Sequence, residues 1–500
     1  MRLKALIPAA SRRAWRLALR LVGVAIVACL ALVLGFTLYA VGALPPLKPW
    51  HTDRLSQEFS AYTDRNLDFD GYLKLETRLF EEMAKTIAGW DSSDEAFAFS
   101  RFNPASALSR LAEGAPFNRS FRLSPPSPVG GALLIHGLTD SPYSVLALAR
   151  SLHAAGFEVT VLRVPGHGTL PSMMVEMSMG DWTAAVRIAA RDVAARTPAA
   201  APFYIGGYST GGTLALLHTL DTLNDPALRR PDRVLLISPA ISLTRVAMLA
   251  EVIDLFSVVP VPLLEKVRWQ EVGAEFDPYK FNSFPVNGAR QVNRATRALQ
   301  RALARADESG RLARLPPVVT WQSVVDSTVG SAGVVDGLYA RLQGAEHRLV
   351  LFDVNREPAL RSVQRPAAAA LIERVERRAY RHTVDVVTSE GGQTNEVKVL
   401  RVDPGGARST QDTGLTWPAN LVSLGHVALP FPPDDPVYGF MVGSGRDGIP
   451  SIGSWTLRGE SGATTISLGS LTRLRSNPFW SLIADDVAGM AAADVGRSKP

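Results

Sequence analysis

The sequence predicts an α/β fold in which a mostly parallel sheet carries helices on both faces. Three observations predict it: short apolar runs alternate with helical segments from residue 129 onward, glycine-rich turns separate them, and the apolar content suffices for a large core. The chain has 500 residues, more than one minimal domain needs, and 46% of them are hydrophobic. We therefore expect one large α/β domain with additional segments around it.

The regular part follows a turn-rich linker, "LSPPSPVGG" (123–131). The predicted elements alternate as strand "GALLIHG", a helix closed by Gly156, strand "FEVTVLRV", helix "DWTAAVRIAARDVAAR", strand "PFYIGG", helix "TGGTLALLHTL" and strand "DRVLLISPA". After a break, "PPVVTWQSVVD" resumes the sheet. Strands that alternate with helices of this length indicate parallel pairing.

Two interruptions divide the predicted α/β domain, which we place at 129–486. Residues 244–314 hold helical patterns without an obvious strand, and we expect a cap over the strand ends. Its apolar stretch "VIDLFSVVPVPLL" either lines an acyl-chain pocket or forms the core of the cap. A second insertion is expected at 347–415, and the flanking segments are an N-terminal extension (45–128) and a C-terminal tail (487–500).

The N-terminal region predicts a membrane anchor. Residues 21–44 carry no charge and are long enough to cross a bilayer as a helix. Basic residues without any acid precede them in segment 1–20, so the positive-inside rule places the N-terminus in the cytoplasm and the remaining chain across the membrane. In a Gram-negative cell that is the periplasmic side. The alternative is a signal peptide cleaved near "AVG" (40–42).

Charge and cysteine content exclude several classes of partner. The net charge of +6 is modest for this length, and no basic run is interleaved with aromatic residues, so we expect no nucleic-acid partner. The single cysteine, Cys29, permits neither an intrachain disulfide nor a cysteine-based metal site. We expect no metal and no cofactor.

The stretch "IGGYSTGG" (205–212) stands between a predicted strand and a predicted helix, where two kinds of chemistry are possible. A phosphate-binding loop needs a lysine after its second glycine, and Gly212 occupies that position. The dinucleotide fingerprint also fails, because Ser209 stands where its second glycine belongs. What remains is G-x-S-x-G, in which Ser209 is a nucleophile on a sharp elbow and Gly207 and Gly211 leave room for the turn.

A serine nucleophile needs a base, and the base needs an orienting carboxylate. Among the histidines that follow Ser209, we choose His426 because it lies in a proline-rich loop after a strand, and we expect His347 and His382 at the surface. Asp326 ends a strand and is our choice of acid, against Asp336 and Asp353. The gap of 100 residues between acid and base is long (426 − 326 = 100), and the second insertion must account for it.

An acyl-transfer site also needs donors for an oxyanion. The backbone N–H of Thr210, directly after the nucleophile, is one expected donor, and that of Leu138, after the first strand, is the other. His136 precedes the serine, so we assign it a structural role, and we expect His167 to be a loop residue beside the pocket.

The motifs "LLIHGLTDSPYS", "VLRVPGHGTLP", "GGYSTGG" and "GHVALP" resemble the α/β-hydrolase superfamily over about residues 129–440. The chain is most similar to monoacylglycerol lipases, carboxylesterases and serine aminopeptidase-type hydrolases. The resemblance implies an α/β-hydrolase fold, the Ser209–His426–Asp326 triad, and acyl transfer to a lipid-like or acylated small-molecule ester without a cofactor. There are two alternatives: a peptidase or amidase of this fold, and a catalytically silent binding protein.

Overall fold

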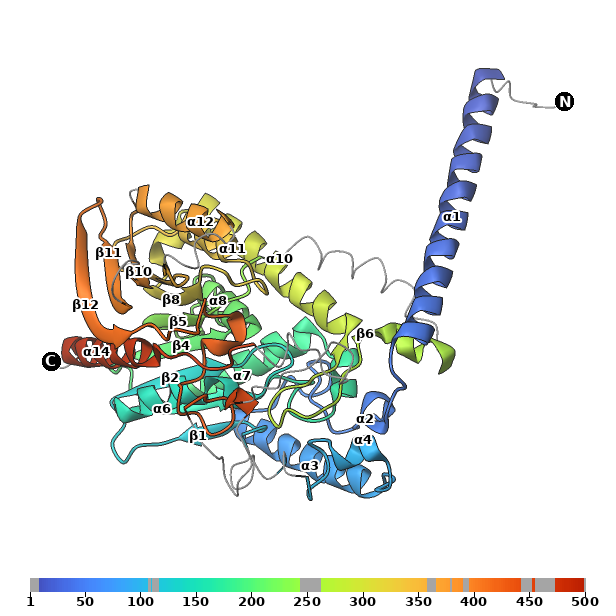
Figure 1. Cartoon of the computed structure of the whole chain (residues 1–500), viewed down its shortest axis with the longest axis horizontal. Coiled ribbons are helices and arrows are strands. Elements are labelled where there is room, and N and C mark those ends of the chain that lie inside the picture. The colour runs from blue at the N-terminus through green and yellow to red at the C-terminus, as the bar shows by residue number, and fades with distance from the viewer. Residues whose placement is uncertain are drawn as a thin grey trace.

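The computed structural model describes residues 9–106, 109, 117–242, 262–357, 366–377, 380–389, 395–441, 452–454 and 473–498. These residues form a mostly parallel sheet of ten strands with helices on both faces (Figure 1), so the predicted fold class is confirmed. The strands, in sheet order, are β1 (Phe121–Leu123), β3 (Phe157–Leu162), β2 (Gly130–Ile135), β4 (Phe203–Tyr208), β5 (Arg233–Ile237), β8 (Val318–Ser323), β9 (Arg348–Phe352), β10 (Thr383–Ser389), β11 (Glu396–Val402) and β12 (Arg408–Thr416).

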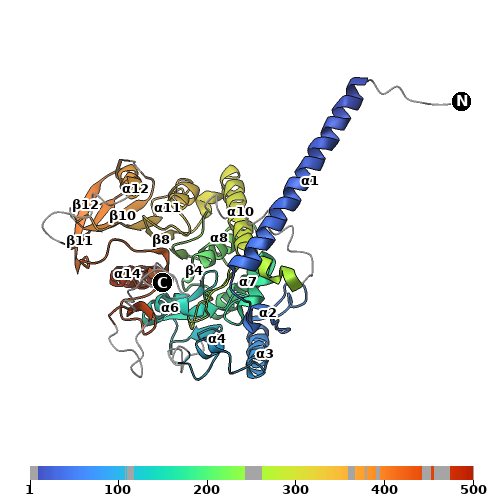
Figure 2. The ribbon, with the colours of Figure 1, turned by 45° about the vertical axis from the view of Figure 1, so that its right-hand side comes forward.

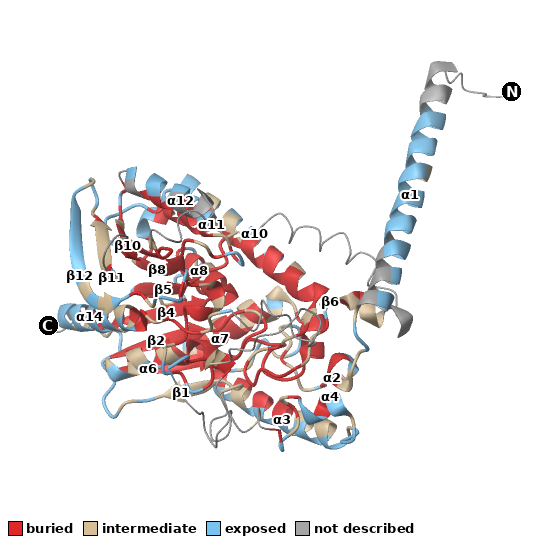
Figure 3. Ribbon diagram, in the orientation of Figure 1, coloured by how far each residue is buried: buried red, intermediate tan, exposed pale blue. Residues whose placement is uncertain are grey.

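The seven strands from β3 to β10 pair in parallel, and antiparallel strands close both edges. The inner strands are apolar because both of their faces are covered. Along β4 the side chains alternate, with Phe203 and Ile205 on one face and Tyr204 and Tyr208 on the other. Figure 3 shows the resulting buried centre of the molecule.

Different helices cover the two faces of the sheet (Figure 1). One face packs against α7 (Met179–Arg196), α8 (Thr210–Thr222), α10 (Val286–Glu308) and α12 (Pro366–Arg377). The other packs against α6 (Leu146–Ala154) and α14 (Trp480–Ser498). The shorter turns are η1 (Pro142–Val145), η2 (Pro171–Val175), η4 (Pro262–Arg268), η5 (Arg311–Arg314), α11 (Ser331–Val334), η6 (Val335–Tyr339), η8 (His426–Ala428) and η10 (Ile452–Ser454).

The predicted insertions need correction. Residues 347–415 are not a separate insertion, because β9 to β12 continue the main sheet. In the predicted cap 244–314, residues 244–261 lie outside the described residues, so most of the apolar stretch 252–264 does too. The short strands β6 (Trp269–Glu271) and β7 (Phe284–Pro285) pair with each other, and α10 belongs to the main helical layer because its apolar side packs against α8.

The C-terminal boundary also differs from the prediction. The expected tail 487–500 continues α14 as far as Ser498. Its apolar residues at helical spacing, Ile483, Val487 and Ala491, are buried against the sheet. Asp494 on the same helix forms an ion pair with Arg233 of β5 (2.9 Å), so this segment is an integral part of the domain.

The N-terminal extension packs against the sheet domain as well. It contains α2 (Pro49–Thr52), α3 (Phe69–Ala88) and α4 (Glu95–Ala98). Trp50, Leu79 and Phe97 share an apolar cluster with Leu170 and Met173 of the segment around η2. The chain therefore enters the domain directly after its apolar helix, without a free linker.

That apolar helix is α1 (Ala9–Ala43), which stands away from the domain in both views (Figures 1 and 2). The side chains between Trp15 and Leu32 are not buried by any other part of the described chain. An exposed apolar surface of this length is typical of a membrane span or a signal sequence, and the helix is one or the other. At its base, Lys266 Nζ donates to the carbonyl of Leu44 (3.0 Å).

Candidate active site

Ser209 lies at the carboxyl end of β4, immediately before α8. Its backbone has φ 53° and ψ −119°, a conformation that a residue with a side chain adopts at a cost of about 1–3 kcal/mol. The surrounding backbone holds it there: the N–H of Ser209 donates to the carbonyl of Ile237 (3.0 Å), and its carbonyl accepts from the N–H of Ala240 (3.1 Å). Strain held in place at a strand-to-helix turn is the geometry of a nucleophile elbow.

The two glycines beside Ser209 allow the chain segments to approach closely. A Cβ atom on Gly207 would lie 2.4 Å from the carbonyl carbon of Gly211. A Cβ atom on Gly211 would lie 2.0 Å from the carbonyl oxygen of Ile135 and 2.5 Å from that of His136. The start of α8 therefore rests directly on the end of β2, and any larger residue at position 211 displaces one of them.

His426 and Asp326 meet although 100 residues separate them in the chain. His426 Nδ1 lies 2.8 Å from Asp326 Oδ2, and both side chains are buried. The segment before His426 is fixed to the sheet, since Ser323 Oγ at the end of β8 donates to the carbonyl of Leu424 (2.7 Å). The sheet strands β9 to β12 account for the long interval, and the chain then returns to the end of β8.

The acid of this pair has a stabilised negative charge. Burial alone raises the pKa of Asp326, but the charge and hydrogen bond of His426 outweigh it, together with the N–H groups of Thr328 and Val329. The pKa of Asp326 is therefore lower than its ordinary value. An ionised carboxylate at this position orients the imidazole and leaves its Nε2 available as a base.

The His426–Asp326 pair lies close to Tyr208, the residue before Ser209. The ring of Tyr208, the residue before the serine, lies 5.0 Å from the His426 ring, and its hydroxyl donates to the His426 carbonyl (3.3 Å). Ser209 follows β4 and Asp326 follows β8, two parallel strands whose carboxyl ends lie at the edge at which α/β proteins bind ligands, and the hydrogen bond between Ser323 and Leu424 brings the segment before His426 to the same edge. The structure thus pairs His426 with Asp326 and places Ser209 at the same edge of the sheet, and the assignment of the three residues as a triad stays a prediction.

The two expected oxyanion donors also lie at this edge. Thr210 is the first residue of α8, so its N–H has no acceptor within the helix. Leu138 lies in the turn after β2, whose Gly137 is in contact with the elbow: a Cβ atom on Gly137 would lie 3.1 Å from Ser209 Cβ. Thr210 is therefore adjacent to Ser209 in the chain, and the turn that carries Leu138 contacts Ser209 through Gly137.

The sequence analysis missed Asp140 and Lys280. A Cβ atom on Gly137 would lie 2.7 Å from Asp140 Oδ2, so this buried carboxylate is on the same side of the turn as Ser209. Burial raises the pKa of Asp140. Two neighbouring groups limit that rise: Lys280, whose Nζ lies 3.3 Å from Asp140 Oδ1, and His426. The stretch "HGLTDS" contains an acid three residues after Gly137, and this acid could have indicated Asp140. The residues around Lys280 contain no such indication.

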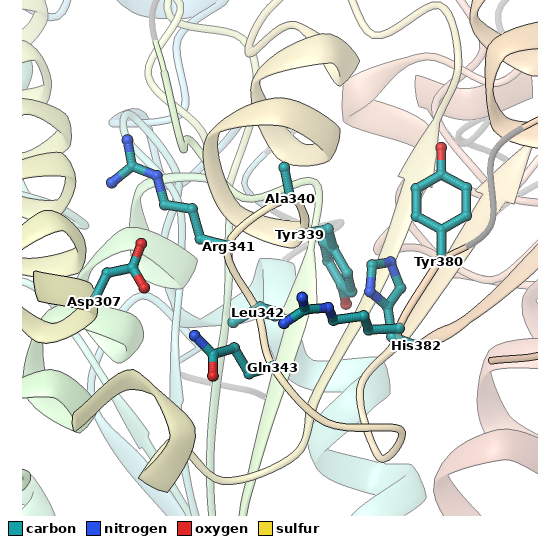
Figure 4. A pocket seen from close by; sticks show the side chains of 9 residues that line it. Asp307, Tyr339, Ala340, Arg341, Leu342, Gln343, Tyr380 and His382 are labelled. Atoms are coloured by element: carbon teal, nitrogen blue, oxygen red, sulfur yellow. The ribbon is translucent and has the colours of Figure 1, made fainter. Parts of the chain in front are cut away.

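The rejected acids and bases lie elsewhere. His347 accepts from the N–H of Val318, and His382 packs between the rings of Tyr339 and Tyr380. Both histidines are buried, contrary to the expectation of a surface position. His382 lines a cavity of about 310 Å³ (Figure 4), and Ser209, Asp326 and His426 are not among the residues that line it.

The competing acids Asp336 and Asp353 form ion pairs with arginines, Arg374 and Arg356 respectively. Over the part of the chain that the structure describes, no group of three or more His, Cys, Asp or Glu side chains is placed to hold a metal ion.

Comparisons with known proteins find a family model and a curated relative that match part of the chain. Residues 126–349 match the family model described as serine aminopeptidase, S33. A thermostable monoacylglycerol lipase of Bacillus sp. (strain H-257) is 36% identical over 86 residues, which are 17% of this chain and 33% of that protein, so the match spans about a third of the curated relative.

Several solved structures are similar to the chain. A structure of the metagenome-derived lipolytic enzymes LipS and LipT has a TM-score of 0.38 and 22% identity, with 48% of this chain and 89% of that chain covered. A soluble variant of monoglyceride lipase from Saccharomyces cerevisiae has a TM-score of 0.36 and 15% identity, with 46% of this chain and 81% of that chain covered.

Proposed function

We propose that this chain, which belongs to the α/β-hydrolase superfamily and is of the lipase/esterase type, is a serine hydrolase that cleaves carboxylic esters through an acyl-enzyme. The observation that carries the proposal is a serine on a strained elbow beside a buried His–Asp pair, Ser209 with His426 and Asp326. A silent binding protein has no need to hold a serine at φ 53° next to such a pair.

The proposed reaction has two steps. His426 Nε2 takes the proton of Ser209 Oγ, which attacks the ester carbonyl, and the N–H groups of Leu138 and Thr210 hold the oxyanion. His426 returns the proton to the leaving alcohol, and an acyl-enzyme remains. Water, activated by the same histidine, then attacks the acyl carbonyl, releases the acid and restores Ser209. Asp326 keeps the imidazole oriented throughout and stabilises its charged form.

Esters are favoured over amides as substrates because the curated relative is a monoacylglycerol lipase. The family description, serine aminopeptidase, makes the amide alternative worth a direct test. The full chain, solubilised in detergent, is assayed on p-nitrophenyl acyl esters and on aminoacyl p-nitroanilides. We expect faster turnover of the esters, and faster turnover of the anilides would overturn the ester assignment.

The assignment of the base is tested with two matched histidine variants. His426→Ala is expected to lower kcat/KM at least about 10³-fold. His382→Ala, which removes a buried histidine from another part of the sheet, is expected to keep the rate within a fewfold of the parent. The reverse pattern would refute the assignment of His426.

We further propose that residues 21–44 anchor the chain in the membrane, with the N-terminus in the cytoplasm and the catalytic domain exported. The continuous helix α1, which is uncovered between Trp15 and Leu32, supports this proposal, and so does the short connection between α1 and the packed segment from Trp50 onward. The intact mass of the protein from membranes tests it. Loss of the segment up to about residue 42 would show that it is a cleaved signal peptide.

A further inference from the structure

His136 stands at the end of β2 with its side chain 1% exposed, and both ring nitrogens have a hydrogen-bond partner. The backbone N–H of Val164 donates to Nε2 (2.9 Å). The carbonyl oxygen of Gly137 lies 2.8 Å from Nδ1. The sequence analysis assigned this histidine only a structural role.

The partners determine where the imidazole proton is. A backbone N–H can only donate, so Nε2 of His136 is an acceptor without a proton. A carbonyl can only accept, so Nδ1 carries the proton and donates it to Gly137. Burial, together with the neighbouring ring of His167, lowers the pKa of His136 well below its ordinary value, which keeps the ring neutral.

The carbonyl that accepts this hydrogen bond belongs to the peptide group between Gly137 and Leu138. The carbonyl of Gly137 and the N–H of Leu138 are two ends of the same planar, trans peptide, so they point in opposite directions. The same carbonyl also accepts from the N–H of Asp140 (3.3 Å). A fixed carbonyl fixes the direction of the Leu138 N–H, and a hydrogen bond to the carbonyl polarises the peptide and strengthens the N–H as a donor.

We propose that His136 is a positioning residue of the oxyanion site: its Nδ1–H holds the Gly137–Leu138 peptide so that the Leu138 N–H is presented beside Ser209. The inference rests on the proposed function, because it assigns Leu138 as an oxyanion donor. His136 itself touches neither substrate nor reacting atoms, and it acts through the peptide that it holds.

The support continues into the N-terminal extension, outside the matched family region 126–349. Val164, the donor to His136, follows Arg163, whose carbonyl accepts from the hydroxyl of Tyr72 (2.7 Å). The guanidinium of Arg163 is held by Glu58 (2.9 Å). Residues of α3 and of the segment before it therefore fix the strand end that orients His136.

Two nearly isosteric variants separate the two hydrogen bonds. In His136→Asn the side-chain amide NH₂ replaces Nδ1–H and keeps the donor to Gly137, but it loses the acceptor for Val164. In His136→Gln the amide oxygen reaches the place of Nε2 and keeps the acceptor for Val164, but the donor to Gly137 is lost. The pair thus distinguishes an effect on the oxyanion peptide from an effect on packing.

The full chain and both variants are compared by ester hydrolysis and by the inhibition constant for a trifluoromethyl ketone, whose adduct with Ser209 contains an oxyanion. We expect His136→Gln to lose about 10- to 100-fold in kcat with KM nearly unchanged, since removal of a whole oxyanion donor costs about 10²–10³. The ketone is expected to bind more weakly by the same factor. His136→Asn is expected to keep kcat within about fivefold.

Equal rates in His136→Gln and the parent, or a loss confined to His136→Asn, would overturn the inference. If His136→Gln does not fold, Tyr72→Phe takes its place, because it removes only the hydroxyl that holds Arg163, and an unchanged kcat in it then refutes the inference. A parent protein without Ser209-dependent turnover would refute the proposed function and this inference together, whereas an active parent with insensitive variants refutes the inference alone.

Discussion

Replacement of Gly211 by alanine tests the elbow geometry most sharply. The new Cβ would lie 2.0 Å from the carbonyl oxygen of Ile135, and an ordinary C···O contact needs about 3.3 Å. The two segments must therefore separate by about 1.3 Å. Ile135 belongs to β2, which is paired on both sides with β3 and β4, so the start of α8 has to move instead.

Ser209 is two residues before that point and moves with it. A displacement of about 1 Å at a catalytic group costs about 10²-fold in rate, and overpacking costs about 1–3 kcal/mol in the free energy of unfolding. We expect Gly211→Ala to lower kcat/KM for p-nitrophenyl esters by about 10² or more. Urea unfolding of the same variant is measured in parallel. It shows whether a lower rate comes from a displaced active site or from loss of the folded protein.

Gly489→Ala is the matched control. Gly489 lies inside α14 with nothing within 4 Å of its added Cβ, so the substitution adds helix propensity alone and is expected to stabilise the protein by up to about 1 kcal/mol without altering the rate. A Gly211→Ala protein that hydrolyses esters within threefold of the parent would refute the reasoning, because the close approach of α8 and β2 would then not exist.

Three further predictions concern buried charges. Arg163→Met leaves the buried carboxylate of Glu76 without its cation and is expected to cost about 3–5 kcal/mol in unfolding free energy at pH 8, measured in urea. Burial raises the pKa of Glu76, so the carboxyl takes up a proton as the pH falls and the loss of unfolding free energy becomes smaller. A loss under 1 kcal/mol at pH 8 would contradict the prediction. Burial raises the pKa of Glu275 to about 7 from 4.5, so the folded protein binds a proton that the unfolded chain releases, and stability falls by about 3 kcal/mol as the pH rises through that window. Glu275→Gln is expected to flatten this part of the curve, and parallel curves for parent and variant would exclude the effect. Asp494→Ala leaves Arg233 nearly buried without its ion pair and is expected to cost about 2–4 kcal/mol, whereas an unchanged unfolding midpoint would show that α14 is not held by this contact.

Local signals account for the parts of the fold and site that the sequence predicted. The inner strands are short apolar runs because helices cover both faces, and the elbow is visible because two glycines must flank a serine in a strained turn. Ser209 and Asp326 could be selected because each follows an inner strand, and the carboxyl ends of parallel strands meet at one edge of the sheet.

The errors arose where distant pairing determines the structure. Residues 347–415 were expected to be an insertion, but β10 pairs with β9 and extends the main sheet. Residues 487–500 were expected to be a tail, although Ile483, Val487 and Ala491 are spaced at four residues and mark a buried helical stripe. Lys280 reaches Asp140 across 140 residues, and no local pattern announces such a pair.

Covalent labelling of Ser209 tests the central claim most directly. The full chain is treated with a fluorophosphonate, and the modified peptide is identified by mass spectrometry in the parent and in Ser209→Ala. We expect one label, on Ser209, that is absent from Ser209→Ala and forms much more slowly in His426→Ala. A folded parent protein that takes up no label, or one that is labelled equally after Ser209→Ala, would contradict it.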